Sequence, residues 1–264
     1  METARIAELL RPFLTAQTKE DKGDLSFHAG SSPEESAGLS ESQLLAVSTY
    51  LDLLLRWNAR FNLTAVRAPE EIVTRHFGES LFAARHLFPG PSPVVLKHPR
   101  IRPGSALSEV EKSSSQQGSG VAAGQAPHLI DIGSGAGFPG LPIKIWAPEL
   151  QLTLIESNQK KAIFLREVAR SLTLTNVNVI TRRAEDVEFF DSATVTLRAV
   201  ERFERVLPTA LRLAGPGGRL ALLIGQAQVP AADEFDGIRW DAALPIPLSQ
   251  SRVLLVGELI AQLS

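Results

Sequence analysis

A glycine-rich turn, DIGSGAGFPGLP at residues 131–142, begins where a short apolar stretch, LIDIG at 129–133, ends. Gly133, Gly135 and Gly137 allow a tight turn and the close approach of a ligand to the backbone at the start of a helix. Phe138 occupies the position of the third glycine in a dinucleotide-binding fingerprint. The spacing GxGxG therefore disfavours NAD and favours a nucleoside ligand without a pyrophosphate.

The chain from residue 128 onward alternates between strand-like and helix-like patterns. The predicted strands are 129–133, 152–156, 177–180, 193–197, 219–224 and 252–259, and the predicted helices are 160–172 and 204–214. Such alternation is typical of a parallel sheet whose strands are joined by right-handed crossovers. It predicts an α/β fold with a Rossmann-like, mostly parallel sheet and helices on both faces.

The first 88 residues form a predicted helical N-terminal region. Apolar residues recur at helical spacing over 3–14 and over 41–60. Pro69, followed by two glutamates, predicts the start of another helix that runs to about residue 87.

Two other segments have the composition of connections. Residues 15–38 are predicted to be a polar linker within the helical region. Residues 89–127 are rich in proline, glycine and serine, which predicts a flexible low-complexity insertion with at most a short strand at 94–96. The Rossmann-like domain is then expected over residues 128–264.

Composition and charge exclude several classes of function. The chain has no cysteine, so disulfides, thiolate metal sites and cysteine nucleophiles are excluded. Charged residues interrupt the apolar N-terminus, and no run approaches the roughly 18 apolar residues of a membrane-spanning helix. We therefore expect a cytoplasmic protein without a membrane partner. The net charge of -2 means that RNA binding would depend on a local basic patch.

Three polar positions follow predicted strands. Glu156 lies 23 residues beyond Gly133, where an acid can accept hydrogen bonds from ribose hydroxyls, although a solvated acid is the alternative. Glu185 or Asp186, in the run RRAED at 182–186, could accept a hydrogen bond from an adenine amine, although a solvated charged loop is the alternative. Arg198 ends the fourth predicted strand, where it could meet a carboxylate or phosphate or form a surface salt bridge.

Several segments together resemble one bacterial family. They are LLLRWNARFNLTAVRAPEEIVTRHFGESL at 53–81, LIDIGSGAGFPGLPIKI at 129–145, ESNQKKAIFLREVA at 156–169, RAED at 183–186 and RAV at 198–200. These segments are similar to the 16S rRNA guanine-N7 methyltransferase G family, also called glucose-inhibited division protein B. The resemblance covers about residues 40–88 and 128–226.

The resemblance implies a class I S-adenosylmethionine-dependent methyltransferase that acts on N7 of a guanine in 16S rRNA or the 30S subunit. The implied cofactor is S-adenosylmethionine, and the protein is expected to act as a monomer without a metal. The residues implied to line the cofactor are Gly133, Gly135, Phe138, Glu156, Ala184, Glu185 and Arg198. Because guanine N7 already carries a free lone pair, no catalytic acid or base is expected.

A flipped or unstacked base needs basic and aromatic side chains around it. The candidates for RNA contact are Trp57, Arg60, Phe61, Arg67, Arg75, His76, Lys144, Lys160, Lys161, Arg182, Arg183, Arg202 and Arg205. Trp57 and Phe61, four residues apart on a predicted helix, are more often core residues than stacking platforms. His76 is likewise more often a satisfied, partly buried histidine than a catalyst.

The chain departs from the family pattern at two places, which leaves alternatives open. One is the 89–127 insertion, and the other is Ile224, where the family usually has a lysine before glycine. One alternative is a nicotinamide-dependent oxidoreductase, which would use the same strand, turn and acid. Another is a non-catalytic cofactor-sensing or RNA-binding module.

Overall fold

The computed structural model describes residues 1–15, 38–88, 126–188, 193–198 and 203–260. Almost all of the predicted linker at 15–38 and of the predicted insertion at 89–127, including the short strand at 94–96, lies outside these ranges. The fold below is that of the described residues.

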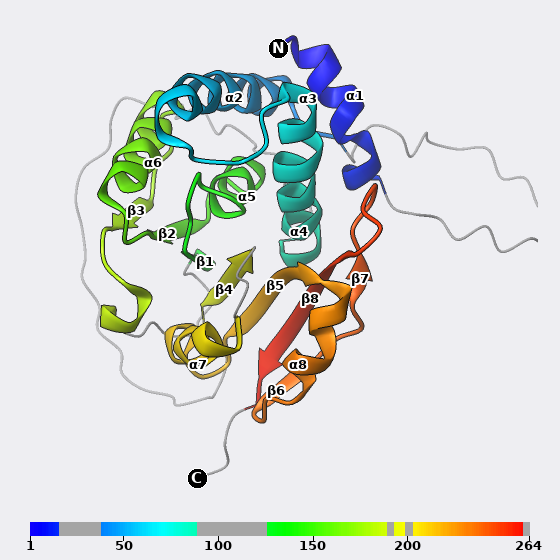
Figure 1. The fold of residues 1–264 in the computed structure, drawn as a ribbon, viewed down its shortest axis with the longest axis vertical. Coiled ribbons are helices and arrows are strands. Elements are labelled where there is room, and N and C mark those ends of the chain that lie inside the picture. The colour runs from blue at the N-terminus through cyan, green and yellow to red at the C-terminus, as the bar shows by residue number, and fades with distance from the viewer. Residues whose placement is uncertain (16–37, 89–125, 189–192, 199–202, 261–264) are drawn as a thin grey trace, which may run out of the picture.

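The centre of the molecule is one sheet of eight strands (Figure 1). The strands are β1 (His128–Ile132), β2 (Gln151–Ile155), β3 (Val177–Ile180), β4 (Thr194–Arg198), β5 (Arg219–Gly225), β6 (Ile238–Trp240), β7 (Leu244–Pro245) and β8 (Arg252–Leu259). Their order is β3-β2-β1-β4-β5-β8-β6, with β7 also paired to β8. The first five strands are parallel, and β8 runs antiparallel to β5.

This architecture confirms the expected α/β fold class, which is a Rossmann-like and mostly parallel sheet preceded by a helical region. The strand order reverses between β1 and β4, and open α/β sheets bind ligands outside the carboxyl ends of the strands at such a switch point. The glycine turn follows β1, and Arg198 ends β4. Both therefore lie at this edge.

Helices cover both faces of the sheet. They are α1 (Thr3–Leu14), α2 (Glu41–Phe61), α3 (Pro69–Ile72), η2 (Val73–Gly78), α4 (Glu79–Leu87), α5 (Gly140–Trp146), α6 (Gln159–Ser171), η3 (Ala184–Asp186), α7 (Phe203–Ala214), η4 (Gln226–Gln228) and α8 (Val229–Asp233). A capping box begins α2: Gln43 N donates to Ser40 Oγ at 3.3 Å, and Ser40 N donates to Gln43 Oε1 at 2.9 Å. The predicted helix over 69–87 is confirmed, and its middle segment, η2, is π-helical.

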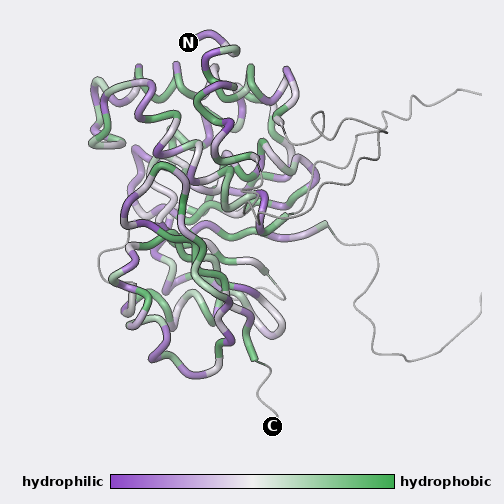
Figure 2. The backbone as a smooth tube through the Cα atoms, turned by 90° about the vertical axis from the view of Figure 1, so that its right-hand side faces the viewer, coloured by the Kyte–Doolittle hydropathy of each residue, from purple (hydrophilic) through white to green (hydrophobic). Residues whose placement is uncertain are grey.

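Each sheet face contributes to its own hydrophobic core, because successive strand side chains point to opposite faces. On β5, Ala221 and Leu223 join the cluster built with α1, α2, α4, α5 and α6, whereas Leu220, Leu222 and Ile224 join the cluster with α7 and α8. In Figure 2, green hydrophobic stretches run through the strands, and the helices alternate between green and purple. The N-terminal helices thus pack directly on the sheet and share its core.

None of the helices among the described residues is long and apolar enough to cross a membrane.

Candidate functional site

The glycine turn after β1 has three residues in the left-handed region that glycine adopts without strain. Their φ angles are +67° at Gly133, +56° at Gly135 and +93° at Gly137. Gly133 N donates to Ile155 O at 2.9 Å, which ties the turn to the end of β2. A Cβ atom added at Gly133 would meet nothing within 4 Å. The backbone here therefore borders open space in which a ligand can approach it closely.

The other side of the turn packs tightly against the helical layer. A Cβ at Gly137 would collide with the Tyr50 hydroxyl and with Leu141. The Tyr50 hydroxyl of α2 donates to Ala136 O, and the Tyr50 side chain is fully buried. Tyr50 was not a predicted site residue, because its helical spacing with Val47 and Leu54 indicates only a core position.

Asp131, near the end of β1, stabilises the turn through hydrogen bonds. Its side chain is buried, Oδ1 accepts from Thr196 Oγ1 at 2.9 Å, and Oδ2 accepts from Gly140 N at 3.3 Å. Burial raises the pKa of Asp131 to about 7, although these hydrogen bonds oppose the shift. A Cβ at Gly140 would lie 2.7 Å from a Leu154 methyl carbon and 3.0 Å from Asp131 Oδ2, so this close packing favours glycine.

Glu156 lies directly beside the glycine turn and is not a solvated acid. Its side chain is buried, Oε2 accepts from Gly135 N at 2.8 Å, and Oε1 accepts from Asn158 N at 2.7 Å. Each carboxylate oxygen has a second lone pair that can still accept a hydrogen bond. Glu156 therefore fixes the turn and keeps acceptor capacity for ligand hydroxyls.

The segment after β3 is the short helix η3, in which Ala184 is buried and Glu185 is exposed. Arg212 of α7 holds this segment by its backbone. It donates to Val187 O at 2.6 Å, to Ala184 O at 3.1 Å and to Glu185 O at 3.3 Å. Arg212 was also missed, because nothing in the sequence relates the last turn of α7 to η3.

Phe138 belongs to an aromatic cluster under the turn. Its ring stacks on Tyr50 with centroids 5.4 Å apart and meets Phe77 edge-on at 5.1 Å. The Arg198 guanidinium carbon lies 5.9 Å from the centre of the Phe138 ring. The cluster joins the turn to η2 and to the end of β4.

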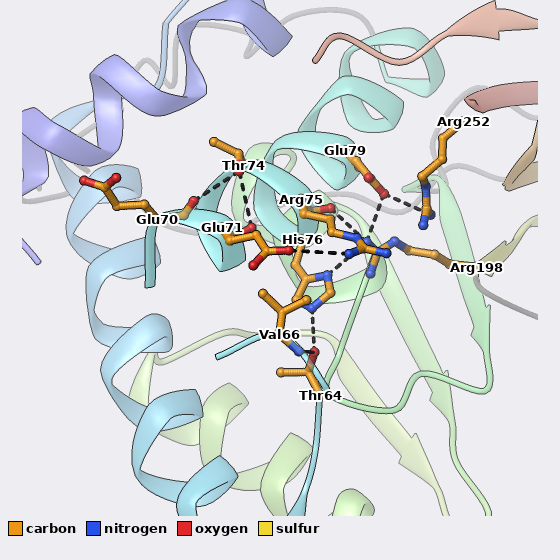
Figure 3. A network of polar contacts seen from close by, with 10 residues as sticks. All are labelled: Thr64, Val66, Glu70, Glu71, Thr74, Arg75, His76, Glu79, Arg198 and Arg252. Atoms are coloured by element: carbon orange, nitrogen blue, oxygen red, sulfur yellow. Dashed lines mark hydrogen bonds and ion pairs between the residues drawn. The ribbon is translucent and has the colours of Figure 1, made fainter. Parts of the chain in front are cut away.

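Arg198 lies in the polar network of Figure 3, and its ion pair is buried and not at the surface. Its Nη2 atom is 2.9 Å from Glu79 Oε2, 2.8 Å from Arg75 O and 3.0 Å from His76 Nδ1. Glu79 is 4% exposed and also lies 3.0 Å from Arg252 Nη2. Neither Glu79 nor Arg252 was a predicted site residue, because both are far from Arg198 along the chain.

His76 is a satisfied, buried histidine. Burial and the charge of Arg198 lower the pKa of His76 to about 3. Arg198 can only donate, so His76 Nδ1 accepts from it and Nε2 carries the proton that is donated to Thr64 Oγ1 at 2.7 Å. We assign this neutral tautomer, which leaves His76 no free nitrogen for proton transfer or metal binding.

The WNARFNLT motif shapes the loop that holds His76. Asn58 Oδ1 accepts from Thr64 N at 2.9 Å, and Asn62 ends α2 in the left-handed conformation with φ +45°. Arg67 donates to Asn58 O at 3.0 Å and to Asn62 Oδ1 at 2.6 Å. Asn58, Asn62 and Arg67 therefore position a loop, and this is a physical reason for the motif.

The candidates for RNA contact divide by exposure. Lys144 was a wrong candidate, because it is 1% exposed and donates to the carbonyls of Pro148 and Leu150. His76 is excluded by its burial as well. The exposed or half-buried candidates are Trp57, Arg60, Phe61, Arg67, Arg75, Lys160, Lys161, Arg182, Arg183 and Arg205, and Arg202 lies outside the described residues.

Two exposed candidates contact each other at this edge. Lys160 Nζ lies 5.4 Å from the centre of the Phe61 ring, and Phe61 in turn packs on Trp57 with centroids 5.2 Å apart. Lys160 is in the first turn of α6, just beyond Glu156. An exposed aromatic ring and a cation thus lie on the same edge as the glycine turn.

Comparison with known proteins identifies relatives of this chain. The family model named GidB, described as rRNA small subunit methyltransferase G, matches residues 43–92 and 114–236. A ribosomal RNA small subunit methyltransferase G from Chloroflexus aggregans is 38% identical over 187 residues, which are 69% of this chain and 64% of that protein. One from Xylella fastidiosa is 35% identical over 188 residues, 71% of each chain. This chain therefore spans less than two thirds of the Chloroflexus relative.

Solved structures are more distant. A SAM dependent methyltransferase from Aquifex aeolicus is 17% identical and covers 52% of this chain and 85% of that one, with a TM-score of 0.44.

Proposed function

This chain belongs to the rRNA small subunit methyltransferase G family, and on that premise we propose that it transfers a methyl group from S-adenosylmethionine to N7 of a guanine in 16S rRNA. By resemblance to the family, the target is guanine 527. The observation that carries the proposal is the open backbone at Gly133, which lies at the carboxyl end of β1 next to the buried carboxylate of Glu156.

The residues present fit a nucleoside cofactor. The open side of Gly133 and Gly135 would hold it at the turn, and Glu156 has remaining acceptor capacity for ribose hydroxyls. Ala184 and Glu185, held by Arg212, would lie by the adenine. Phe138, in the aromatic cluster with Tyr50 and Phe77, and Arg198, at the end of β4, would complete the site. When bound, S-adenosylmethionine supplies an activated methyl group.

The chain's own contribution is positioning and not proton transfer. Guanine N7 has a free lone pair, and no proton must leave before it attacks. His76, the histidine nearest to Arg198, is neutral with both nitrogens hydrogen bonded. Holding the base in line with the methyl group turns an encounter of two molecules into one oriented step, which accounts for a large share of such rate increases.

Exposed cations near this edge support an RNA substrate. Arg60, Lys160, Arg182 and Arg183 are exposed, and none of the ion pairs in the described part of the chain involves them. Arg60 is in the last turn of α2, Lys160 is in the first turn of α6 after β2, and Arg182 and Arg183 come shortly after β3. Exposed cations that follow the strand ends would attract the RNA backbone despite the net charge of -2. We propose 16S rRNA or the 30S subunit as the partner, in the cytoplasm, with the protein acting as a monomer.

The test is the transfer of labelled methyl from S-adenosylmethionine to small-subunit RNA and to 30S particles. Gly133→Asp places a bulky anion in the open space at the turn, and we expect it to abolish both cofactor binding and transfer. Gly237→Asp is the matched control, because Gly237 also has positive φ and open space around its Cβ but lies between α8 and β6. The control should keep full activity.

Two outcomes would contradict the proposal. Cofactor binding by the wild-type chain without label on either RNA substrate would favour the non-catalytic module. Calorimetric binding of NAD with no affinity for S-adenosylmethionine would favour the oxidoreductase instead.

A further inference from the structure

A groove of about 390 Å³ opens between the α3–η2 segment and the loop that joins β7 to β8. Its lining includes Glu71, Thr74, Arg75, Glu79, Leu248 and Arg252. Arg252 begins β8 opposite Gly225 at the end of β5, so the groove lies at the same carboxyl edge as Arg198. No residue of the glycine turn lines it, and we call it the Arg252 groove.

The charges beneath the groove are not balanced. Arg198 and Arg252 both pair with the single carboxylate of Glu79, at 2.9 Å and 3.0 Å. Their side chains are 8% and 20% exposed, so the excess positive charge is largely withdrawn from water. Buried charge without a counter-charge is costly, so an anionic ligand in this groove would be stabilising.

Several guanidinium N–H groups also lack acceptors. Arg252 Nε and Nη2 and Arg198 Nε are buried without a hydrogen-bond partner among the described residues. Arg252 Nη2 is close enough to Glu79 to form an ion pair but not oriented to donate to it. Buried donors are nearly always satisfied in native proteins, so these point to an oxygen-rich ligand.

The mouth of the groove has features that suit a nucleic acid chain better than a small ion. Arg75 is half exposed there, and its only recorded ion pair in the described residues is a weak one to Glu71 at 3.5 Å. Leu248, 72% exposed, has a φ of +60° that is unusual for a branched residue. Such strain is concentrated where a side chain contacts a ligand.

We propose that the Arg252 groove binds a phosphodiester of the RNA strand that flanks the methylated guanine, with Arg252 and Arg75 contacting the phosphate. Guanidinium groups bind phosphate oxygens through paired, charge-assisted hydrogen bonds. Leu248 lies beside this phosphate and contacts the adjoining ribose or base. The inference rests on the proposed function, because it requires an RNA substrate at this edge.

The test is equilibrium binding of a labelled small-subunit RNA fragment at several salt concentrations. Each phosphate contact contributes about 0.7 to 0.9 to the slope of log affinity against log salt concentration. We expect Arg252→Gln to reduce the slope by about this amount, whereas Arg252→Lys, which keeps the charge, should retain the wild-type slope. Arg239→Gln is the control, because Arg239 is 72% exposed and pairs with Glu258 away from the groove.

Other outcomes would overturn the inference. An unchanged slope in Arg252→Gln, with weaker S-adenosylmethionine binding, would mean that Arg252 only supports Arg198. Inorganic phosphate that displaces RNA at micromolar concentration would indicate a small-anion pocket. If Arg252→Gln does not fold, Arg75→Gln gives the same test, because that side chain is half exposed.

The experiment separates this inference from the proposed function. Binding does not require methyl transfer, so a reduced slope without any label transfer would retain the groove and reject the methyltransferase. Normal methyl transfer by Arg252→Gln, with an unchanged salt slope, would retain the methyltransferase and reject phosphate binding in the groove.

Discussion

Asp131 links the sheet to the glycine turn through hydrogen bonds from Thr196 and Gly140. Its carboxyl is buried, and its pKa rises from 3.8 in the unfolded chain to about 7 in the folded one. Folding therefore favours the protonated form. The contribution of Asp131 to stability is fully present below about pH 4 and is lost as the pH rises through 7.

Asp131→Asn should remove this dependence, because the amide does not titrate in the range. We expect the free energy of unfolding of the wild-type chain, relative to Asp131→Asn, to fall by up to about 1.4 kcal/mol for each pH unit from 4 to 7. Urea denaturation of both proteins at a series of pH values measures it. Parallel pH profiles would show that the Asp131 carboxyl is ionised in the folded protein throughout.

Site residues could be predicted from the sequence where they belong to a recognisable motif. Gly133, Gly135 and Glu156 lie together because a strand, a turn and the next parallel strand bring them to one edge. Pairs made through tertiary packing gave no signal: Tyr50 reaches Ala136 across 86 positions, and Arg198 reaches Glu79 across 119. Sequence periodicity shows that such side chains are buried but not which partner they meet.

At the scale of elements, the long strands could be predicted from their apolar runs, with ends that differ by a residue or so. The short strands β6 and β7 could not, since two or three residues pair only because β8 is already in place. The π-helical η2 was also missed, because apolar periodicity does not distinguish it from an α-helix. Ile224, at the position where the family usually has a lysine, packs in the core with α7 and α8. This position therefore provides no positive charge near the glycine turn.

Arg212 links helix α7 to η3 through hydrogen bonds to the η3 backbone. Arg212→Lys leaves a side chain that cannot reach the three carbonyls of Ala184, Glu185 and Val187 together. We expect it to lower stability by about 1 to 2 kcal/mol and to weaken S-adenosylmethionine binding several-fold. Thermal unfolding and calorimetry measure the two effects.

The matched control is Arg205→Lys, an exposed position on the same helix. Equal cofactor affinity in Arg212→Lys and Arg205→Lys would show that η3 keeps its position without Arg212 or does not contact the cofactor.

At the scale of the whole molecule, the helical region and the sheet form one structure. Helices α1, α2 and α4 share a hydrophobic core with one sheet face, and α2 and η2 reach the glycine turn and Arg198. The N-terminal helices thus help to build the site as well as cover the sheet. The carboxyl edge gathers the open turn, the exposed cations and the Arg252 groove on one side of the molecule.

We propose that this edge places a methyl group on guanine N7 of 16S rRNA. The most direct measurement treats the methylated RNA with borohydride and then aniline, which cleaves the strand at N7-methylguanosine, and maps the break. We predict a single cleavage at one guanosine, present with the wild-type chain and Gly237→Asp and absent with Gly133→Asp. Label that stays in the RNA without any cleavage would contradict the claim, because the methyl group would then lie on another atom.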